Sequence, residues 1–246
     1  MSLADRLFAT FDRLYVINLA TRDDRRREMA EELARLGLGF DHPRVRLFDA
    51  IRPESAGPFR STGAHGAFLS QLGLLAEARK DGLRSILMLE DDCDFVASAR
   101  ERLPQQLDRL DSEGFGLFYG GHELPEGDAG FDPTGQDLVR VPPALTIRLA
   151  HCLGFGPAAI EALPDFLGAM LTRPAGSPDG GPMDVDGAYN WFRRAFPVCP
   201  TDLAIPPIAY QRPSRTDISA TGPLDRLPGP LRRVARGARR AWQRRR

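Results

Sequence analysis

Four carboxylates that follow a short apolar segment are the side chains in this sequence with the clearest capacity for chemistry. Residues 85–89 read Ser-Ile-Leu-Met-Leu, and Glu90, Asp91, Asp92 and Asp94 follow within five residues. Carboxylates this close repel one another and raise one another's pKa unless a cation neutralises them. Oxygen-only ligands suit Mg²⁺ or Mn²⁺, and such an ion can in turn hold a diphosphate. A solvated acidic turn that caps the next helix is the other interpretation, and the cluster by itself leaves both open.

The elements that must position these acids alternate between strand and helix patterns. Strands are predicted at 14–19, 45–51, 85–89 and 115–119, with two more within 139–155, and helices at 24–36, 66–80, 157–167 and 184–196. Gly37 is the expected stop of the first helix, Gly120-Gly121 is interpreted as a turn, and 125–143 and 173–183 as loops, the first with a hairpin as an option. The alternation predicts an α/β fold with a mostly parallel central sheet flanked by helices. Ligands bind beyond the carboxyl ends of such strands, where the acids lie.

Several segments, taken in order, resemble one known family. They are 16–19 with Arg22 and Arg25, then 48–51, then 66–71, and the hydrophobic strand 86–89 that ends in Glu-Asp-Asp; weaker similarities follow at 151–159, 182–184 and 211–218. In this order they resemble glycosyltransferase family 25, the bacterial lipooligosaccharide and lipopolysaccharide glycosyltransferases. The strand with Glu-Asp-Asp is the most specific motif, and the resemblance spans about residues 14 to 218.

The resemblance implies a GT-A-like, single nucleotide-binding domain, which we place at residues 1–222. It implies that a sugar moves from a nucleotide donor, usually UDP-linked, to a cell-surface glycan or lipopolysaccharide acceptor, with Mn²⁺ or Mg²⁺ in an acidic site. Asp92 is then the favoured metal ligand with Glu90 as its partner, and Asp94 can replace either. Two positions depart from the family pattern, since Ala67 stands where cysteine is usual and Gln71 where histidine is usual. A glutamine keeps a hydrogen bond but lacks a positive charge, which bears on donor choice and on activity.

Further site residues follow from their places in the predicted fold and, for Ser70 and Gln71, from the family motif that they resemble. The residues expected to bind the donor are Asn18, Arg22, Arg25, Ser70, Gln71 and Asp91. Arginines at a strand end suit nucleotide phosphates, although they can equally be solvated helix charges, and a serine within a helix often bonds only to the helix backbone. Asp184, with Asp186 second, is the expected catalytic base because it opens a helix after a Gly- and Pro-rich loop. A simple N-cap role for Asp184 is equally compatible with its position.

The chain is neutral only because two unlike parts cancel. Residues 224–246 hold nine arginines and one acid, a net charge of +8, which leaves −8 for the remainder. Apolar residues and Trp242 recur in this tail at helical spacing, so we interpret 223–246 as an Arg-rich amphipathic helix that binds an anionic membrane surface. A solvated tail is the alternative, and nucleic acid is not expected as a partner because the remaining domain is acidic and lacks a recognised motif.

Location and rival functions complete these expectations. The N-terminus lacks the pattern of a secretion signal, no apolar stretch is long enough to span a membrane, and the three cysteines show no CxxC spacing. These features predict a cytoplasmic protein. The basic tail predicts a peripheral location on the inner face of the cytoplasmic membrane, and the family resemblance implies a glycan or lipid-linked saccharide acceptor. The rival functions are a non-catalytic module that binds nucleotide sugars or glycans, and a Mg²⁺-dependent nucleotidyl- or phosphotransferase, although no Walker-type glycine loop is present.

Overall fold

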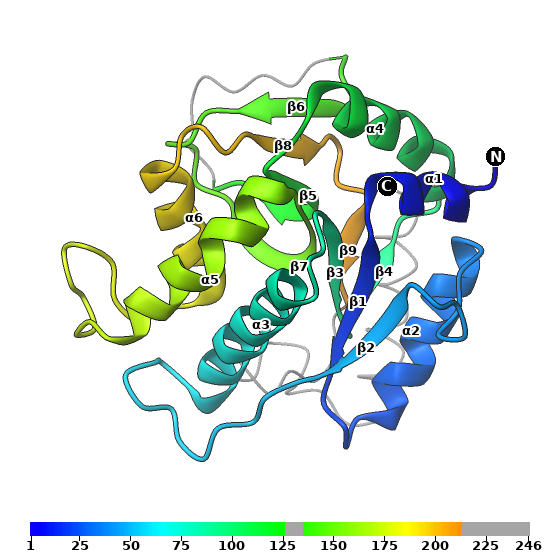
Figure 1. Ribbon diagram of the computed structural model, residues 1–246. Coiled ribbons are helices and arrows are strands. Elements are labelled where there is room, and N and C mark those ends of the chain that lie inside the picture. The colour runs from blue at the N-terminus through cyan, green and yellow to red at the C-terminus, as the bar shows by residue number, and fades with distance from the viewer. Residues whose placement is uncertain (126–134, 213–246) are drawn as a thin grey trace.

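The apolar segment before the acids forms strand β3 (Ile86–Glu90), whose first four residues are buried. The computed structural model describes residues 1–125 and 135–212. In it β3 lies within a seven-stranded sheet of order β2-β1-β3-β7-β5-β8-β6 (Figure 1). The other strands are β1 (Arg13–Asn18), β2 (Val45–Asp49), β5 (Leu117–Glu123), β6 (Leu138–Val141), β7 (Arg148–Phe155) and β8 (Thr201–Ala204). A strand covered on both faces reads as a continuous apolar run, as β3 does.

Five of the seven strands run in the same direction. β1 pairs in parallel with β2 and β3, and β5 pairs in parallel with β8. β7 runs antiparallel between β3 and β5, and β6 runs antiparallel to β8 at the edge. The predicted α/β class with a mostly parallel sheet is therefore confirmed, and the carboxyl ends of β1, β2 and β3 meet at one edge.

Six helices cover the two faces of the sheet in the described part of the chain (Figure 1). They are α1 (Leu3–Thr10), α2 (Asp23–Arg35), α3 (Thr62–Lys80), α4 (Ala99–Glu113), α5 (Pro157–Leu171) and α6 (Val185–Ala195). Alternate residues of β1 point to opposite faces, so Tyr15 packs in a core with α3, α5 and α6, whereas Leu14 packs in a second core with α1, α2 and α4.

A small second sheet lies directly after the acids. β4 (Cys93–Phe95) pairs antiparallel with β9 (Ala209–Gln211), with Cys93 opposite Gln211. The backbone N–H of Arg212 then donates to the carbonyl of Asp92 at 2.7 Å. This pairing brings the last described residues beside the acidic segment.

Most predicted elements are confirmed, with shifted boundaries. α3 begins at Thr62, earlier than predicted, because Ser61 caps it and accepts a hydrogen bond from the N–H of Ala64. Gly37 follows α2 with φ +78°, as expected of a helix stop. Helices α1 and α4 and strands β4, β8 and β9 were not predicted.

The predicted turn at Gly120-Gly121 is wrong, because both glycines lie within β5. A Cβ atom at Gly120 would collide with the Cys152 sulfur, and one at Gly121 would collide with the His151 ring. Because neither glycine has a Cβ atom, side chains of β7 can lie close against β5. Such a close approach is a known reason for glycine within a strand.

Two sequence interpretations fall wholly or partly beyond the described residues. The Arg-rich tail 223–246, with its membrane role, lies outside them, and so does the 126–134 part of the predicted loop. Within residues 1–125 and 135–212, no helix is both long and apolar enough to cross a bilayer.

Candidate active site

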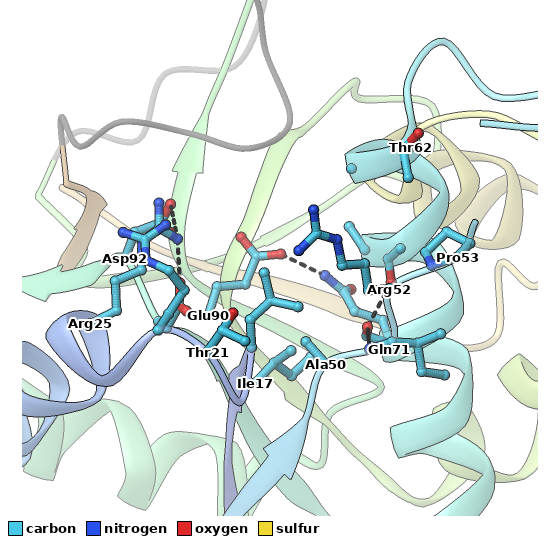
Figure 2. Close-up of a pocket in the computed structure, with 18 of the residues that line it drawn as sticks. Ile17, Thr21, Arg25, Ala50, Arg52, Pro53, Thr62, Gln71, Glu90 and Asp92 are labelled. Carbon is cyan, nitrogen blue, oxygen red and sulfur yellow. Dashed lines mark hydrogen bonds and ion pairs between the residues drawn. The ribbon is translucent and has the colours of Figure 1, made fainter. Parts of the chain in front are cut away.

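A cavity of about 490 Å³ lies at the edge where β1, β2 and β3 end (Figure 2). Its walls come from the turn after β1, the loop after β2, the first turns of α3, the acids after β3, and Gln211 of β9. Ligand sites in α/β sheets form at this edge, and their volumes commonly range from about 300 to 1,000 Å³. The cavity is therefore placed and sized for a small-molecule ligand.

Seven of the eleven predicted site residues line this cavity: Arg22, Arg25, Ser70, Gln71, Glu90, Asp91 and Asp92. Asn18, Asp94, Asp184 and Asp186 do not line it. The structure thus brings together the arginines after β1 and three of the four clustered acids, whereas the predicted catalytic bases lie elsewhere.

Asp91 is held by side chains of the β1–α2 region. Asn18 donates from Nδ2 to its Oδ2 at 2.8 Å, and Arg25 donates from Nη1 to its Oδ1. Arg25 also lies 3.6 Å from Asp92, and the side chains of Arg25 and Asp91 are only 10% and 9% exposed. A buried carboxylate requires a partner of this kind. The structure therefore gives Arg25 and Asn18 a role in fixing the acids, and contact with a donor remains a prediction for both.

Glu90 is the acid that the surroundings perturb most. Burial raises its pKa to about 8, assisted by the negative charges of Asp92 and Asp91. A hydrogen bond of 2.9 Å from Gln71 Nε2 to Glu90 Oε1 opposes this rise (Figure 2). A carboxylate in this position would be ionised more readily if a cation were bound beside it.

Asp92 has an unsatisfied oxygen. Burial raises its pKa to about 6, although the charge of Arg25 opposes the rise. Its Oδ2 accepts a 3.3 Å hydrogen bond from Gln211, whereas Oδ1 is buried and has no hydrogen-bond partner within the described part of the chain. Leaving a buried polar atom unpaired costs about 1–3 kcal/mol, and more for a charged group. A bound cation would remove this cost.

The donor set fits a divalent ion that is shared with a ligand. Glu90 and Asp92 present two carboxylates to one cavity, and Mg²⁺ is commonly held by one or two carboxylates together with substrate phosphates and water. Among residues 1–125 and 135–212, no three His, Cys, Asp or Glu side chains converge to hold an ion by themselves. The residues therefore suit an ion whose remaining ligands come from a phosphate and from solvent.

Asp94 is directed away from these two acids. It is fully buried and accepts hydrogen bonds from Nε and Nη2 of Arg212 at 2.8 and 2.6 Å. Arg212 also pairs with Glu28 of α2. Asp94 therefore takes part in an internal ion pair and does not line the cavity.

The two predicted bases are each bound to other groups. Asp184 occupies the N-cap position of α6 without a capping bond, and its Oδ1 accepts from Arg60 Nε at 2.7 Å. Arg60 itself lines the cavity, so Asp184 reaches the site only through this pair. Asp186 accepts from the N–H groups of Leu149 and Gly187 at 3.1 and 2.8 Å. It thereby stabilises Leu149, whose φ of 72° is unusual for a non-glycine residue.

Ser70 connects two walls of the cavity. Its hydroxyl donates to the carbonyl of Gly66 at 2.6 Å and accepts from the N–H of Ile51 at 2.8 Å. The first bond is the local helix bond that its sequence position suggested, and the second ties the loop after β2 to α3.

Five polar cavity residues were not predicted: Thr21, Arg52, Arg60, Thr62 and Gln211. Arg52 follows the carboxyl end of β2, so the rule that selected Arg22 after β1 would also have selected Arg52. Gln211 begins the weak similarity at 211–218 but was given no role in the site, because it reaches Asp92 only through the β4–β9 pairing.

Without metal, Glu90→Gln is expected to be more stable than the wild type at about pH 9, and the difference should shrink toward about pH 5. An acid whose folded-state pKa is raised stabilises the fold fully below its ordinary pKa of 4.5, and this contribution is lost as the pH rises through about 8. Glutamine does not titrate and avoids the loss. Denaturant unfolding in EDTA at several pH values measures the difference, and a gap independent of pH contradicts the expectation.

Comparison with known proteins adds structural similarity only. No protein-family model matches the chain. No curated protein matches it. The structure is similar to that of a glycosyltransferase involved in the glycosylation of the major capsid of PBCV-1, with 12% identity, 82% of this chain and 93% of the other covered, and a TM-score of 0.48.

Two other solved structures are similar at lower scores. Mannose-1-phosphate geranyltransferase from Thermus thermophilus shows 14% identity over 78% of this chain and 72% of its own, with a TM-score of 0.38. A197 from STIV shows 9% identity over 85% of this chain and 96% of its own, also with a TM-score of 0.38. The resemblance to family 25 accordingly stays an interpretation of sequence motifs, and function is inferred from the cavity.

Proposed function

We propose that this chain is a metal-dependent glycosyltransferase with a GT-A-like fold that takes a sugar from a nucleotide donor, UDP-linked in the first instance. The observation that carries the proposal is the unsatisfied carboxylate of Asp92 beside the perturbed Glu90, both facing a cavity that arginines also line. Carboxylates and arginines in one cavity suit a ligand that brings both a cation and phosphates.

The reaction places separate demands on the side chains. An acceptor hydroxyl attacks the anomeric carbon, the bond from that carbon to the β-phosphate oxygen breaks, the hydroxyl proton passes to a base, and the nucleoside diphosphate leaves. Glu90 and Asp92 would hold Mn²⁺ or Mg²⁺, and the ion's chemistry is to neutralise the charge that develops on the leaving diphosphate. Arg22 and Arg52 lie where they can bind phosphate oxygens, and the cavity walls hold the donor in line.

The proposed base is one of two aspartates near the start of α6. Asp184 is the candidate closest to the cavity, because its partner Arg60 lines the wall. A phosphate that bound Arg60 would release the Asp184 carboxylate to accept a proton. Both predicted bases are engaged in other bonds, and this observation favours the alternative of a binding module without catalysis. The acceptor is proposed to be a cell-surface or lipid-linked glycan, handled in the cytoplasm at the inner membrane face through residues 224–246.

A donor panel tests the function. The purified chain is incubated with UDP-, GDP-, CMP- and dTDP-linked sugars and MnCl₂, and released nucleotide is measured with and without saccharide acceptors. Release that requires Mn²⁺ and one donor supports the transferase. A thermal shift with UDP and Mn²⁺ but no release with any donor or acceptor favours the binding module. No shift with any nucleoside diphosphate contradicts the proposal.

Arg52→Ala is expected to weaken binding of the donor about tenfold or more, because a charge-assisted hydrogen bond contributes about 1.5–3 kcal/mol. Arg52 lines the cavity, and Figure 2 shows it across the cavity from Arg25 with its side chain directed inward. A phosphate bound between these walls would lie within its reach. Arg84→Ala, which removes an exposed arginine at the opposite end of β3, is the matched control.

Isothermal titration with the nucleoside diphosphate and with the free nucleoside measures the effect. Arg52→Ala should lose affinity for the diphosphate and keep its affinity for the nucleoside. Equal losses for both ligands would show that Arg52 contacts another part of the donor.

A further inference from the structure

Three side chains from three elements form a continuous hydrogen-bonded chain that ends at the cavity. The Tyr189 hydroxyl of α6 donates to Gln71 Oε1 of α3 at 2.7 Å, and Gln71 Nε2 donates to Glu90 Oε1 of β3 at 2.9 Å (Figure 2 shows the second bond). Tyr189 and Gln71 are both fully buried. A buried amide with two such partners has one preferred orientation.

The order of donors and acceptors fixes that orientation. An amide oxygen can only accept and an amide nitrogen can only donate, so the Gln71 NH₂ group faces the Glu90 carboxylate and the Gln71 amide oxygen accepts from the Tyr189 hydroxyl. When Glu90 is ionised, as it must be to bind a cation, the reverse orientation would place the amide oxygen of Gln71 against a carboxylate oxygen of Glu90, and two acceptors repel. Burial raises the pKa of Tyr189, which keeps its hydroxyl protonated and able to donate.

Glu90 keeps one oxygen for a ligand. Its Oε1 accepts from Gln71, and no hydrogen bond to Oε2 is present within residues 1–125 and 135–212. Residues that hydrogen-bond to a metal-ligating side chain fix the orientation of that side chain. Their removal typically lowers metal affinity or activity about 10–100-fold. The hydrogen bonds that run from Tyr189 through Gln71 therefore fix the orientation of Glu90, and the two buried side chains also pack in the core.

We propose that Tyr189 is a positioning residue that, through Gln71, holds Glu90 in the orientation that receives the divalent ion. This inference rests on the proposed function only in requiring that Glu90 binds the ion. It assigns α6, which begins beside Asp184 and carries Asp186, a direct connection to the acids after β3.

The first experiment compares two buried tyrosines whose hydroxyls have different hydrogen-bond partners. Tyr189→Phe is expected to weaken Mn²⁺ binding about five- to tenfold, measured by titrating MnCl₂ into donor-free protein. Tyr15→Phe is the matched control, because Tyr15 is equally buried and its hydroxyl donates to Glu77 at 3.1 Å. Glu77 does not line the cavity, so this variant should bind Mn²⁺ like the wild type.

The second experiment varies the middle of the chain and does not depend on how well Tyr189→Phe folds. Gln71→Met removes both hydrogen bonds and should weaken Mn²⁺ binding about 10- to 100-fold. Gln71→His restores one donor and one acceptor in a neutral ring and should bind Mn²⁺ within about threefold of the wild type. A role in packing alone would not separate these two variants in this way.

The outcomes distinguish this inference from the proposed function. If the wild type binds Mn²⁺ and releases nucleotide while Tyr189→Phe and Gln71→Met bind Mn²⁺ equally well, the positioning role is refuted and the transferase stands. A Gln71→His variant as weak as Gln71→Met also refutes it. If the wild type binds no Mn²⁺ with or without nucleotide, the metal-dependent function fails, and the positioning role fails with it.

Discussion

Asp92→Asn is expected to lower kcat/KM for donor turnover about a thousandfold, which corresponds to about 4 kcal/mol in the activation barrier. The substitution keeps the size of the side chain and removes the charge of a carboxylate that lines the cavity and has one unsatisfied oxygen. Removing a single group that stabilises developing charge typically costs about 10²–10³ in rate, and loss of a metal ligand belongs at the upper end. Nucleotide release from the donor identified in the panel measures the effect.

Asp108→Asn provides the control for this substitution. Asp108 is an exposed acid on α4 that pairs with Arg6 at 2.6 Å and does not line the cavity. The Asp108→Asn variant should turn over the donor as the wild type does. The metal affinity of both variants is measured in parallel, because the explanation requires that Asp92→Asn loses Mn²⁺ binding together with rate. A slow Asp92→Asn enzyme with unchanged Mn²⁺ affinity would assign Asp92 another role.

Arg25→Met should lower the free energy of unfolding by about 3 kcal/mol or more, the cost of breaking a buried ion pair from one side. The variant leaves Asp91, only 9% exposed, without its arginine and with the hydrogen bond from Asn18. Urea unfolding followed by circular dichroism measures the loss. Arg22→Met is the comparison, since Arg22 pairs with the exposed Asp24 and such surface pairs contribute about 0–1 kcal/mol.

A double variant separates the buried charge from the lost arginine. Arg25→Met/Asp91→Asn removes both charges and should regain most of the stability that Arg25→Met loses. If the single variant unfolds like the wild type, or if the double variant is no more stable than the single one, Arg25 does not act by neutralising Asp91.

Local patterns predicted the part of this molecule that local forces determine. The buried run of β3, the period of α2 and the glycine after it were predicted correctly, because each depends on residues a few positions apart. The acids at the end of β3 were placed at the correct edge for the same reason. α1 and α4 were missed although both are amphipathic helices, and Pro104 inside α4 obscured its pattern.

Long-range pairing explains what the sequence could not supply. The difference between Asp92 and Asp94 depends on β9 and Arg212, and the side chains of Asp94 and Arg212 meet across 118 residues of chain. The bonds of Asp184 to Arg60 and of Tyr189 to Gln71 span 124 and 118 residues. No spacing rule along the chain anticipates such partners, and for this reason the predicted bases were placed in a cavity that they do not line.

The β4–β9 pairing also has a consequence for biosynthesis. Domains fold from the N-terminus as the ribosome makes them, yet the partner that neutralises Asp94 is residue 212 and a partner of Asp92 is residue 211. A nascent chain that ends before β9 would carry both acids without these partners, even with the other strands of the main sheet already formed. The proposed donor site should therefore be completed late in translation, and prematurely terminated products should fold in part but lack this site.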